Sequence, residues 1–327
     1  MANRSTTRTD VLTPRPPNPQ SLIPNPFLPL LLLLLTTAGC PRAFTRPTPP
    51  APRVLPASPS LEQVIQAVNR NSAQIQSISS SSATLSGPGY PTLRANLAFQ
   101  RPRFFRLRAE TGLTGSEVDL GSNDQVFWFW VRRNEPPAVY FCRHEQFLAS
   151  RARQMIPIDP NWLIEALGVA DFDPSLPHQG PFPDKNNRIR IHTIRETPEG
   201  PTTKVTVVDV ATAWVMEQHV FDAQGRLKAS SLAEGYRRDP LSGLFLPSAV
   251  QVSCPAAQFS MRLDLGNAQI NRLSGNPAEL WTMPSYPGTP MVDLCNPNLI
   301  PPAAASPPAA AVPAMSNRPR RDRPPRM

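Results

Sequence analysis

The sequence predicts an α+β domain built on a strongly curved antiparallel sheet with helices on one face. Two observations carry this prediction: a capped amphipathic helix precedes the first strands, and short strand-like segments then follow one another with tight connections. A second short helix separates an earlier group of strands from a later group. A sheet of about ten strands must curl, and the pattern leaves open whether its edges meet.

The first helix begins at Ser60 and is expected to continue to about Ile75. Ser60-Leu-Glu-Gln63 has the form of a capping box, in which the Gln63 side chain reaches back to the Ser60 amide. One helical face is apolar and is formed by Leu61, Val64, Ile65 and Val68. We expect the helix to end before the serine run 79–82 and to pack on the sheet that follows it.

Residues 93–131 predict three strands. Apolar and polar side chains alternate over residues 93–99 and again over 105–110, where arginines occupy the polar face. The apolar residues no longer alternate over 126–131. A strand that is apolar on both faces must be covered on both, by a core, a lid or a ligand.

Further elements follow in order. Residues 138–142 predict a short strand, and Asp159 to Gly168 predicts a helix with Asp159 as N-cap and Pro160 in the first turn. The proline-rich segment 171–187 is expected to be irregular. The later strands are predicted over residues 188–194, 204–210, 213–221, 226–233, 245–253 and 258–265.

Prolines and arginines are concentrated at the two ends of the chain. Its 327 residues include 43 prolines and carry a net charge of +9. Because most of the excess arginines lie in residues 1–59 and 318–327, the part between them is nearly neutral, and we expect no nucleic-acid partner. We expect a folded domain over 60–300 and a disordered tail over 301–327, whose arginines contact anionic lipid or cell-wall polymer.

The N-terminal segment has the features of a secretory signal. A basic region, a leucine run and small residues before Cys40 make residues 1–39 a signal peptide, and residues 40–59 a proline-rich tether. Thr37-Ala-Gly-Cys40 resembles the bacterial lipobox, in which the cysteine is acylated and anchors the chain to membrane lipid. Pro41 replaces the aspartate associated with inner-membrane retention, so the resemblance favours the outer membrane. The alternative is an ordinary signal peptide with a chance cysteine.

The order of motifs within residues 60–270 resembles the LolA/LolB-like superfamily of periplasmic lipoprotein carriers. The matching parts are the first helix, the strand that ends in Arg101-Pro102, the arginine-bearing strand 104–108 and the tryptophan-containing strand 127–130. The resemblance implies an incomplete β-barrel wrapped around helices, with an apolar cavity that takes acyl chains. It also implies that Arg101 lies at the cavity mouth and hydrogen-bonds a lid; the alternative is a solvated residue at a strand end.

The resemblance places the candidate ligand-binding residues on these strands. They are Arg101, Phe99, Phe105, Leu107, Phe127, Trp128, Phe129 and Trp130. For the large aromatic residues, ordinary core packing without a ligand is the alternative, since such side chains are mostly core.

Motifs for catalysis or metal binding were not found. The histidines His144, His178, His192 and His219 have no metal-ligand spacing, and there is no nucleophile elbow, phosphate loop or dinucleotide fingerprint. Glu117 and Asp119 share a strand face that we interpret as solvated. We therefore predict no enzyme activity, no catalytic residue, no metal and no cofactor.

An odd number of cysteines is left if Cys40 is acylated. Cys142, Cys254 and Cys295 allow one disulfide in an oxidising compartment, and we favour Cys254 with Cys295.

Together these features predict a monomeric, lipid-anchored protein of the cell envelope that faces the periplasm. Its predicted role is to bind lipid or lipoprotein acyl chains in an apolar cavity, and so to act in lipid or lipoprotein localisation. The alternative is a structural or assembly lipoprotein that uses the same fold without a ligand cavity.

Overall fold

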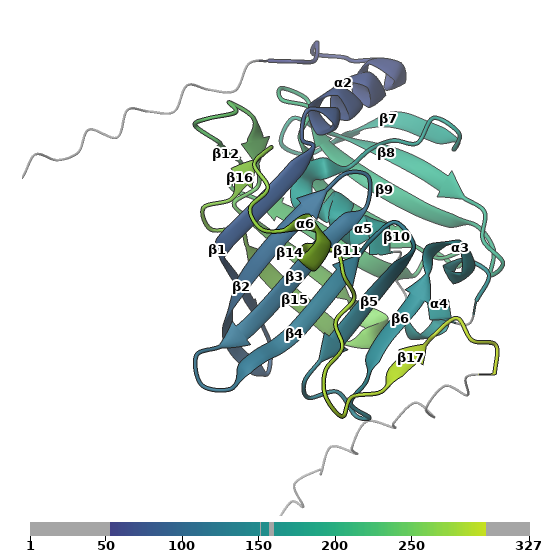
Figure 1. The fold of residues 1–327 in the computed structure, drawn as a ribbon. Coiled ribbons are helices and arrows are strands. Elements are labelled where there is room, and N and C mark those ends of the chain that lie inside the picture. Colours follow the sequence, from purple (N-terminus) through teal and green to yellow (C-terminus); the bar gives the residue numbers. More distant parts are fainter. Residues whose placement is uncertain (1–52, 151, 157–159, 299–327) are drawn as a thin grey trace, which may run out of the picture. The chain divides into compact units, whose positions relative to one another are not determined.

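The computed structural model describes residues 53–150, 152–156 and 160–298. Fifteen of the strands in these residues form one sheet, and Figure 1 shows it curving around a central helical segment. The predictions for the signal peptide, Cys40 and the tail concern residues outside the described ones, as do most of the predicted tether and the N-cap Asp159.

Two antiparallel meanders make up most of the sheet. The first consists of β1 (Ser77–Gly87), β2 (Tyr90–Gln100), β3 (Phe104–Thr111), β4 (Gly115–Ser122), β5 (Val126–Val131) and β6 (Val139–Arg143). The second consists of β7 (His178–Asp184), β8 (Arg188–Arg195), β9 (Thr202–Asp209), β10 (Val215–Phe221), β11 (Leu227–Glu234), β14 (Ala249–Cys254) and β15 (Phe259–Asp264). Pairing of β1 with β15 joins the two meanders.

Short strands extend this arrangement. β16 (Gln269–Ile270) pairs with β1, and β17 (Met291–Asp293) runs parallel to β6. β12 (Arg237–Arg238) and β13 (Phe245–Leu246) form a separate two-stranded ribbon. Within the described residues the end strands β7 and β17 do not pair with each other, so the sheet is open. The predicted fold class, an α+β fold with a strongly curved and incompletely closed antiparallel sheet, is confirmed.

Helix α2 (Leu61–Ala73) has the predicted capping box, with the Ser60 amide bound to Gln63 Oε1 at 2.9 Å. Its buried residues Val64 and Val68 belong to a cluster with Ile191 and Val208 of β8 and β9. The apolar face of α2 therefore packs on the second meander, more than a hundred residues later in the chain, and not on the strands that follow directly.

The predicted second helix lies inside the curve of the sheet. It consists of α5 (Pro160–Ile164) and a wider turn, η1 (Glu165–Val169), in which Gly168 has a φ of 95°. A Cβ on Gly168 would lie 2.8 Å from Pro247, so a side chain there would meet both backbone strain and a close neighbour. Glycine at this position ends the helix as predicted.

The remaining helices of the described residues are one turn long. They are α3 (His144–Phe147), α4 (Ala152–Met155), α6 (Pro277–Leu280) and the 3₁₀ turn η2 (Pro255–Ala257). No helix among the described residues is long and apolar enough to cross a membrane.

Helix α2 ends before the serine run, as predicted, and the run belongs to strand β1. There Ser79 donates to the Arg272 carbonyl at 2.7 Å and Ser80 to the Leu265 carbonyl at 2.8 Å. These bonds satisfy hydroxyl groups that would otherwise be costly to bury.

The prediction that segment 171–187 is irregular was wrong, because it contains β7, which pairs only with β8. An edge strand tolerates its prolines because one side of it needs no ladder hydrogen bonds.

Candidate functional site

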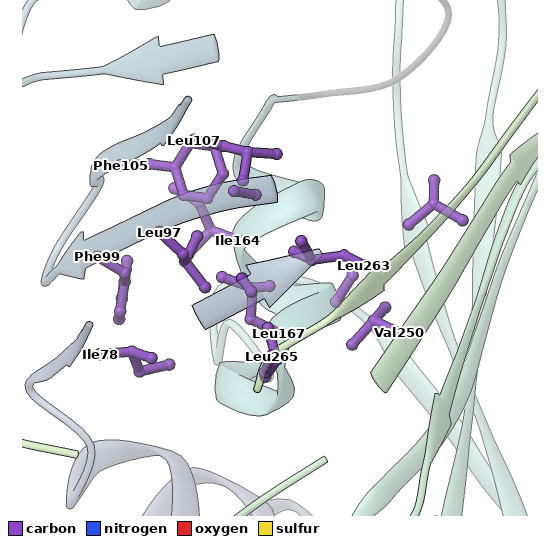
Figure 2. Close-up of a cluster of buried hydrophobic side chains, with 14 of the residues drawn as sticks. Ile78, Leu97, Phe99, Phe105, Leu107, Ile164, Leu167, Val250, Leu263 and Leu265 are labelled. Atoms are coloured by element: carbon purple, nitrogen blue, oxygen red, sulfur yellow. The ribbon is translucent and has the colours of Figure 1, made fainter. Parts of the chain in front are cut away.

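The inner face of β2 and β3 is filled by side chains. Phe99, Phe105 and Leu107 are buried there against Ile164 and Leu167 of the central helical segment, as Figure 2 shows. The apolar space left between Phe105, Leu107 and the helix is about 20 Å³, close to the volume needed for one water molecule. Phe105 and Leu107 therefore leave no room for an acyl chain between themselves and the helix, and Phe99 lies in register with Phe105 on the neighbouring strand.

Strand β5 is covered on both faces, as predicted. Phe127 and Phe129 point inward, where Phe127 lies 5.3 Å edge-on to Phe147 and Phe129 stacks on Tyr140 at 5.1 Å. Trp128 and Trp130 point to the outer face and belong to a different cluster. The four aromatic residues thus line no common space.

The outer face is covered by residues 276–298, which we call the C-terminal strap. Trp130 stacks on Tyr286 of the strap with ring centroids 4.3 Å apart. Arg106 donates to the Thr282 carbonyl at 2.6 Å and lies 5.1 Å from the centre of the Trp128 ring. The strap therefore takes the place of solvent over the polar side of β3 to β5.

A buried ion pair holds the strap in place. Arg106 and Asp119 are joined at 2.6 Å with side chains only 3% and 1% exposed, and the Tyr286 hydroxyl donates to Asp119 at 2.7 Å. Burial lowers the pKa of Arg106, against the opposing effect of Asp119, whereas burial and then Asp119 raise the pKa of Tyr286. The interpretation of Glu117 and Asp119 as a solvated pair was wrong, because both residues are buried.

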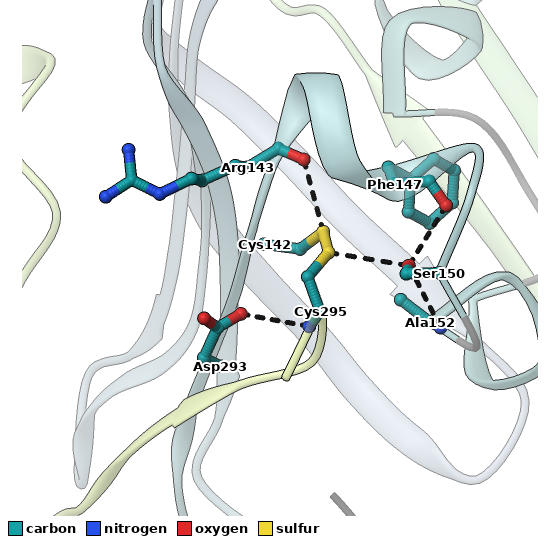
Figure 3. The surroundings of a disulfide bond; sticks show 7 residues. All are labelled: Cys142, Arg143, Phe147, Ser150, Ala152, Asp293 and Cys295. Atoms are coloured by element: carbon teal, nitrogen blue, oxygen red, sulfur yellow. Dashed lines mark hydrogen bonds between the residues drawn. A yellow bond between two sulfur atoms is a disulfide. The ribbon is translucent and has the colours of Figure 1, made fainter. Parts of the chain in front are cut away.

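A disulfide closes the strap onto the sheet. It joins Cys142 of β6 to Cys295, with Cα atoms 5.3 Å apart (Figure 3). The predicted pairing of Cys254 with Cys295 was wrong, because β17 lies beside β6 and brings Cys295 to Cys142. Cys254 is a free, buried thiol in the main core, and burial raises its pKa to about 11.

Arg101 links the sheet to two other elements. Its guanidinium donates to the carbonyls of Ser72 and Ile75 at 3.0 Å each, at the C-terminal end of α2. It also pairs with Asp171, just after η1, at 2.7 Å. Arg101 thus connects β2 to two elements. One is helix α2, which packs on the second meander, and the other is the central helical segment, which packs inside the first meander.

A larger cleft lies elsewhere on the inner side of the sheet. Its volume is about 430 Å³, within the range of small-molecule sites, and it opens between α3 to α5 and strands β8 to β11. Its apolar lining includes Phe147, Ile156, Trp162, Phe172, Val220 and Ala229. None of the predicted ligand-binding residues lines it; Phe127 reaches it only through Phe147.

Charged side chains surround the apolar part of this cleft in pairs. Lys204 binds Glu165 at 2.6 Å, and Arg153 binds Glu199 at 3.1 Å. Within the described residues, one buried guanidinium nitrogen of Arg153 and the indole nitrogen of Trp162 have no hydrogen-bond partner. The residues of this cleft that the sequence could have indicated are the tryptophan in the second helix and the lysines on strands β9 and β11. Their spacing in the sequence does not show that they lie close together.

No protein-family model and no curated protein matches the sequence. Solved structures are similar to it at low sequence identity. A LolA superfamily protein from Nitrosomonas europaea is 10% identical with a TM-score of 0.42, and the match covers 67% of this chain and 97% of that one.

Two further structures match the same share of this chain. A DUF1329 family protein from Desulfovibrio piger is 12% identical over 98% of its length, and a putative outer membrane lipoprotein-sorting protein domain from Vibrio parahaemolyticus is 11% identical over 96%, both with a TM-score of 0.44. At these values the matches carry no argument about function, which has to follow from this chain's own residues.

Proposed function

We propose that the protein is a lipid-anchored, non-enzymatic protein of the cell envelope that binds a lipid or lipoprotein acyl chain in the cleft between α3 to α5 and strands β8 to β11. The observation that carries this proposal is the 430 Å³ cleft, whose lining combines a group of apolar side chains with many polar and charged ones, several of them paired. An apolar surface of this kind suits an acyl chain, and a polar rim suits the ester or carboxylate at its end.

The unpartnered donors beside the cleft support a ligand with an oxygen-rich end. The indole of Trp162 and the guanidinium of Arg153 can only donate hydrogen bonds. Buried donors are costly without an acceptor, so a ligand carbonyl or carboxylate that reached them would gain affinity. This chemistry favours an acyl ester or fatty acid over a plain hydrocarbon.

The proposed ligand site differs from the one suggested by the family resemblance. Residues Phe99, Phe105 and Leu107 then act indirectly, by holding the central helical segment that forms one wall of the cleft. Arg101 acts through Asp171, whose side chain lines the cleft. Trp128 and Trp130 hold the strap.

The membrane anchor is part of the same proposal. Acylation of Cys40 would keep the domain at the periplasmic side of a membrane, with the outer membrane favoured, as a monomer on a proline-rich tether. Cys40→Ser should release the full chain into the soluble fraction. Full membrane retention of that variant would contradict the lipobox assignment.

The binding test uses the full chain with Cys40→Ser and a fluorescent sixteen-carbon fatty acid as probe. Val220→Trp should fill the cleft and weaken probe binding about tenfold or more, because it occupies the space of the chain. Ala256→Trp, on an exposed turn, is the matched control and should bind as the parent does. Native mass spectrometry of the parent should detect co-purified lipid. Absence of both probe binding and co-purified lipid would overturn the proposal.

A structural or assembly role is the second candidate. It is favoured by the close packing between the first meander and the central helical segment, which leaves only about 20 Å³ of empty space. A protein of this kind would bind no probe in its interior, and neither the parent nor Val220→Trp would co-purify with lipid.

A further inference from the structure

A second cleft lies outside the curve of the main sheet, beside the ribbon formed by β12 and β13. It has a volume of about 380 Å³ and lies between that ribbon and residues 267–272. Figure 1 shows β12 of the ribbon next to β16. No residue that lines this cleft also lines the cleft proposed for the acyl chain. The charged residues that line it are Arg237, Arg238, Arg272 and Asp239.

The single acid of this cleft is already engaged by its own turn. One Asp239 oxygen accepts the amide of Ser242 at 2.9 Å and its hydroxyl at 2.6 Å, and the other lies 3.5 Å from Arg272. Burial, the largest influence, would raise the pKa of Asp239, but the hydrogen bonds from Ser242 and the charge of Arg272 together hold it below its usual value. The carboxylate is thus a buried, charged part of the turn, with a side chain only 5% exposed.

The arginines keep donors for a ligand. Arg237 is bound to the Gly266 carbonyl, and Arg238 donates to the Gly243 carbonyl at 3.2 Å. Both residues are exposed. Because a guanidinium carries several N–H donors in a planar fork, each of these side chains can still bind a phosphate. The cleft therefore presents a net positive charge.

An apolar side chain projects beside these cations. Leu241 is 71% exposed at the turn between β12 and β13, directly after Pro240. An exposed leucine next to arginines has the chemistry of a peripheral membrane contact, in which the cations bind phosphates and the apolar group enters the acyl region. By contrast, the charges around the 430 Å³ cleft include several paired carboxylates.

We propose that the β12–β13 ribbon is a docking site for an anionic phospholipid surface. Arg237, Arg238 and Arg272 contact lipid phosphates, and Leu241 enters the boundary between headgroups and acyl chains. The inference does not depend on acyl-chain binding in the other cleft. It orients the domain on a membrane through a surface that is separate from the anchor at Cys40.

The test is sedimentation of the full chain with Cys40→Ser, which removes the acylation site, with vesicles of phosphatidylcholine alone or with about one-third phosphatidylglycerol. Arg237→Gln combined with Arg238→Gln should weaken binding to the anionic vesicles about twenty-fivefold, since each surface arginine contributes about fivefold. Arg94→Gln combined with Arg143→Gln is the control, because these are also exposed arginines, and it should change binding less than threefold.

A second variant tests the apolar contact separately. Leu241→Ser should weaken binding to the same vesicles about tenfold and leave the urea unfolding midpoint unchanged, because the side chain is exposed. Equal losses in the two arginine pairs, or equal binding to neutral and anionic vesicles, would overturn the proposal. So would a ribbon variant that loses binding to soluble polyphosphate but keeps vesicle binding, since the site would then serve soluble anions.

Discussion

The two faces of strands β3 to β5 are covered in different ways. The inner face presents Phe105, Leu107 and Phe127 to apolar partners. The outer face presents an ion pair and two tryptophans to the C-terminal strap. Arg106 there donates to the Thr282 carbonyl, and Asp119 accepts from the Tyr286 hydroxyl. Apolar burial is non-directional, whereas hydrogen bonds and ion pairs fix position. The inner face thus provides bulk stability, and the outer face determines where the strap lies.

Breaking the ion pair should have the largest effect. Asp119→Ala leaves Arg106 buried without its carboxylate and should lower the free energy of unfolding by about 3–5 kcal/mol. Urea unfolding measures this, with the exposed Asp124→Asn as control.

The paired replacement separates charge from packing. Arg106→Met combined with Asp119→Leu should recover most of the lost stability, because no unpaired charge is then buried. If this double variant were as unstable as Asp119→Ala, the loss of stability would come from lost packing. The proposed difference between the outer and inner faces would then be contradicted.

A truncation on the inner face should cost slightly less. Leu107→Ala removes a fully buried side chain and should lower the free energy of unfolding by about 3 kcal/mol. The strap should stay in place, so trypsin cleavage after Arg272 should be no faster than in the parent under native conditions. Faster cleavage there would show that the two faces are coupled through the sheet.

Loss of the disulfide tests the covalent part of the strap. Cys142→Ala combined with Cys295→Ala opens a link between residues 153 positions apart and should cost about 2–4 kcal/mol in urea unfolding. The strap should become more sensitive to proteolysis, and Trp130 fluorescence should change as Tyr286 moves. Cys254→Ala is the comparison, since that thiol is free. An unchanged free energy of unfolding in the double variant would show that Arg106 and Asp119 hold the strap in place without the disulfide.

Removal of the Tyr286 hydroxyl should have the smallest effect. Tyr286→Phe loses one hydrogen bond to a carboxylate, which should cost about 1.5 kcal/mol at neutral pH. Because the pKa of Tyr286 is raised by folding, the unfolded tyrosine ionises first, and this contribution is present below about pH 10 and is lost as the pH rises further. The variant should therefore lose stability less steeply above pH 10 than the parent. If the free energy of unfolding fell equally steeply with pH in the variant and in the parent, this expectation would be contradicted.

Much of the fold could be predicted because it depends on local patterns. The capping box at Ser60 and Gln63 and the glycine at the end of the central helical segment are set by neighbouring residues. The apolar run in β5 required cover on both faces whatever provided it. The candidate site could not be predicted in the same way, because the residues that line it come from helices and strands as far apart as Phe147 and Ala229.

The sequence by itself determined the alternating faces of the strands, the ends of the helices and the need to cover residues 126–131. These features follow from backbone geometry and side-chain periodicity within a few residues. Only the tertiary structure decided that Asp119 is buried, that Cys142 pairs with Cys295 and that a cleft opens beside Trp162. The physical reason is that each depends on a segment far away in the chain, whose position is set by contacts summed over the whole sheet.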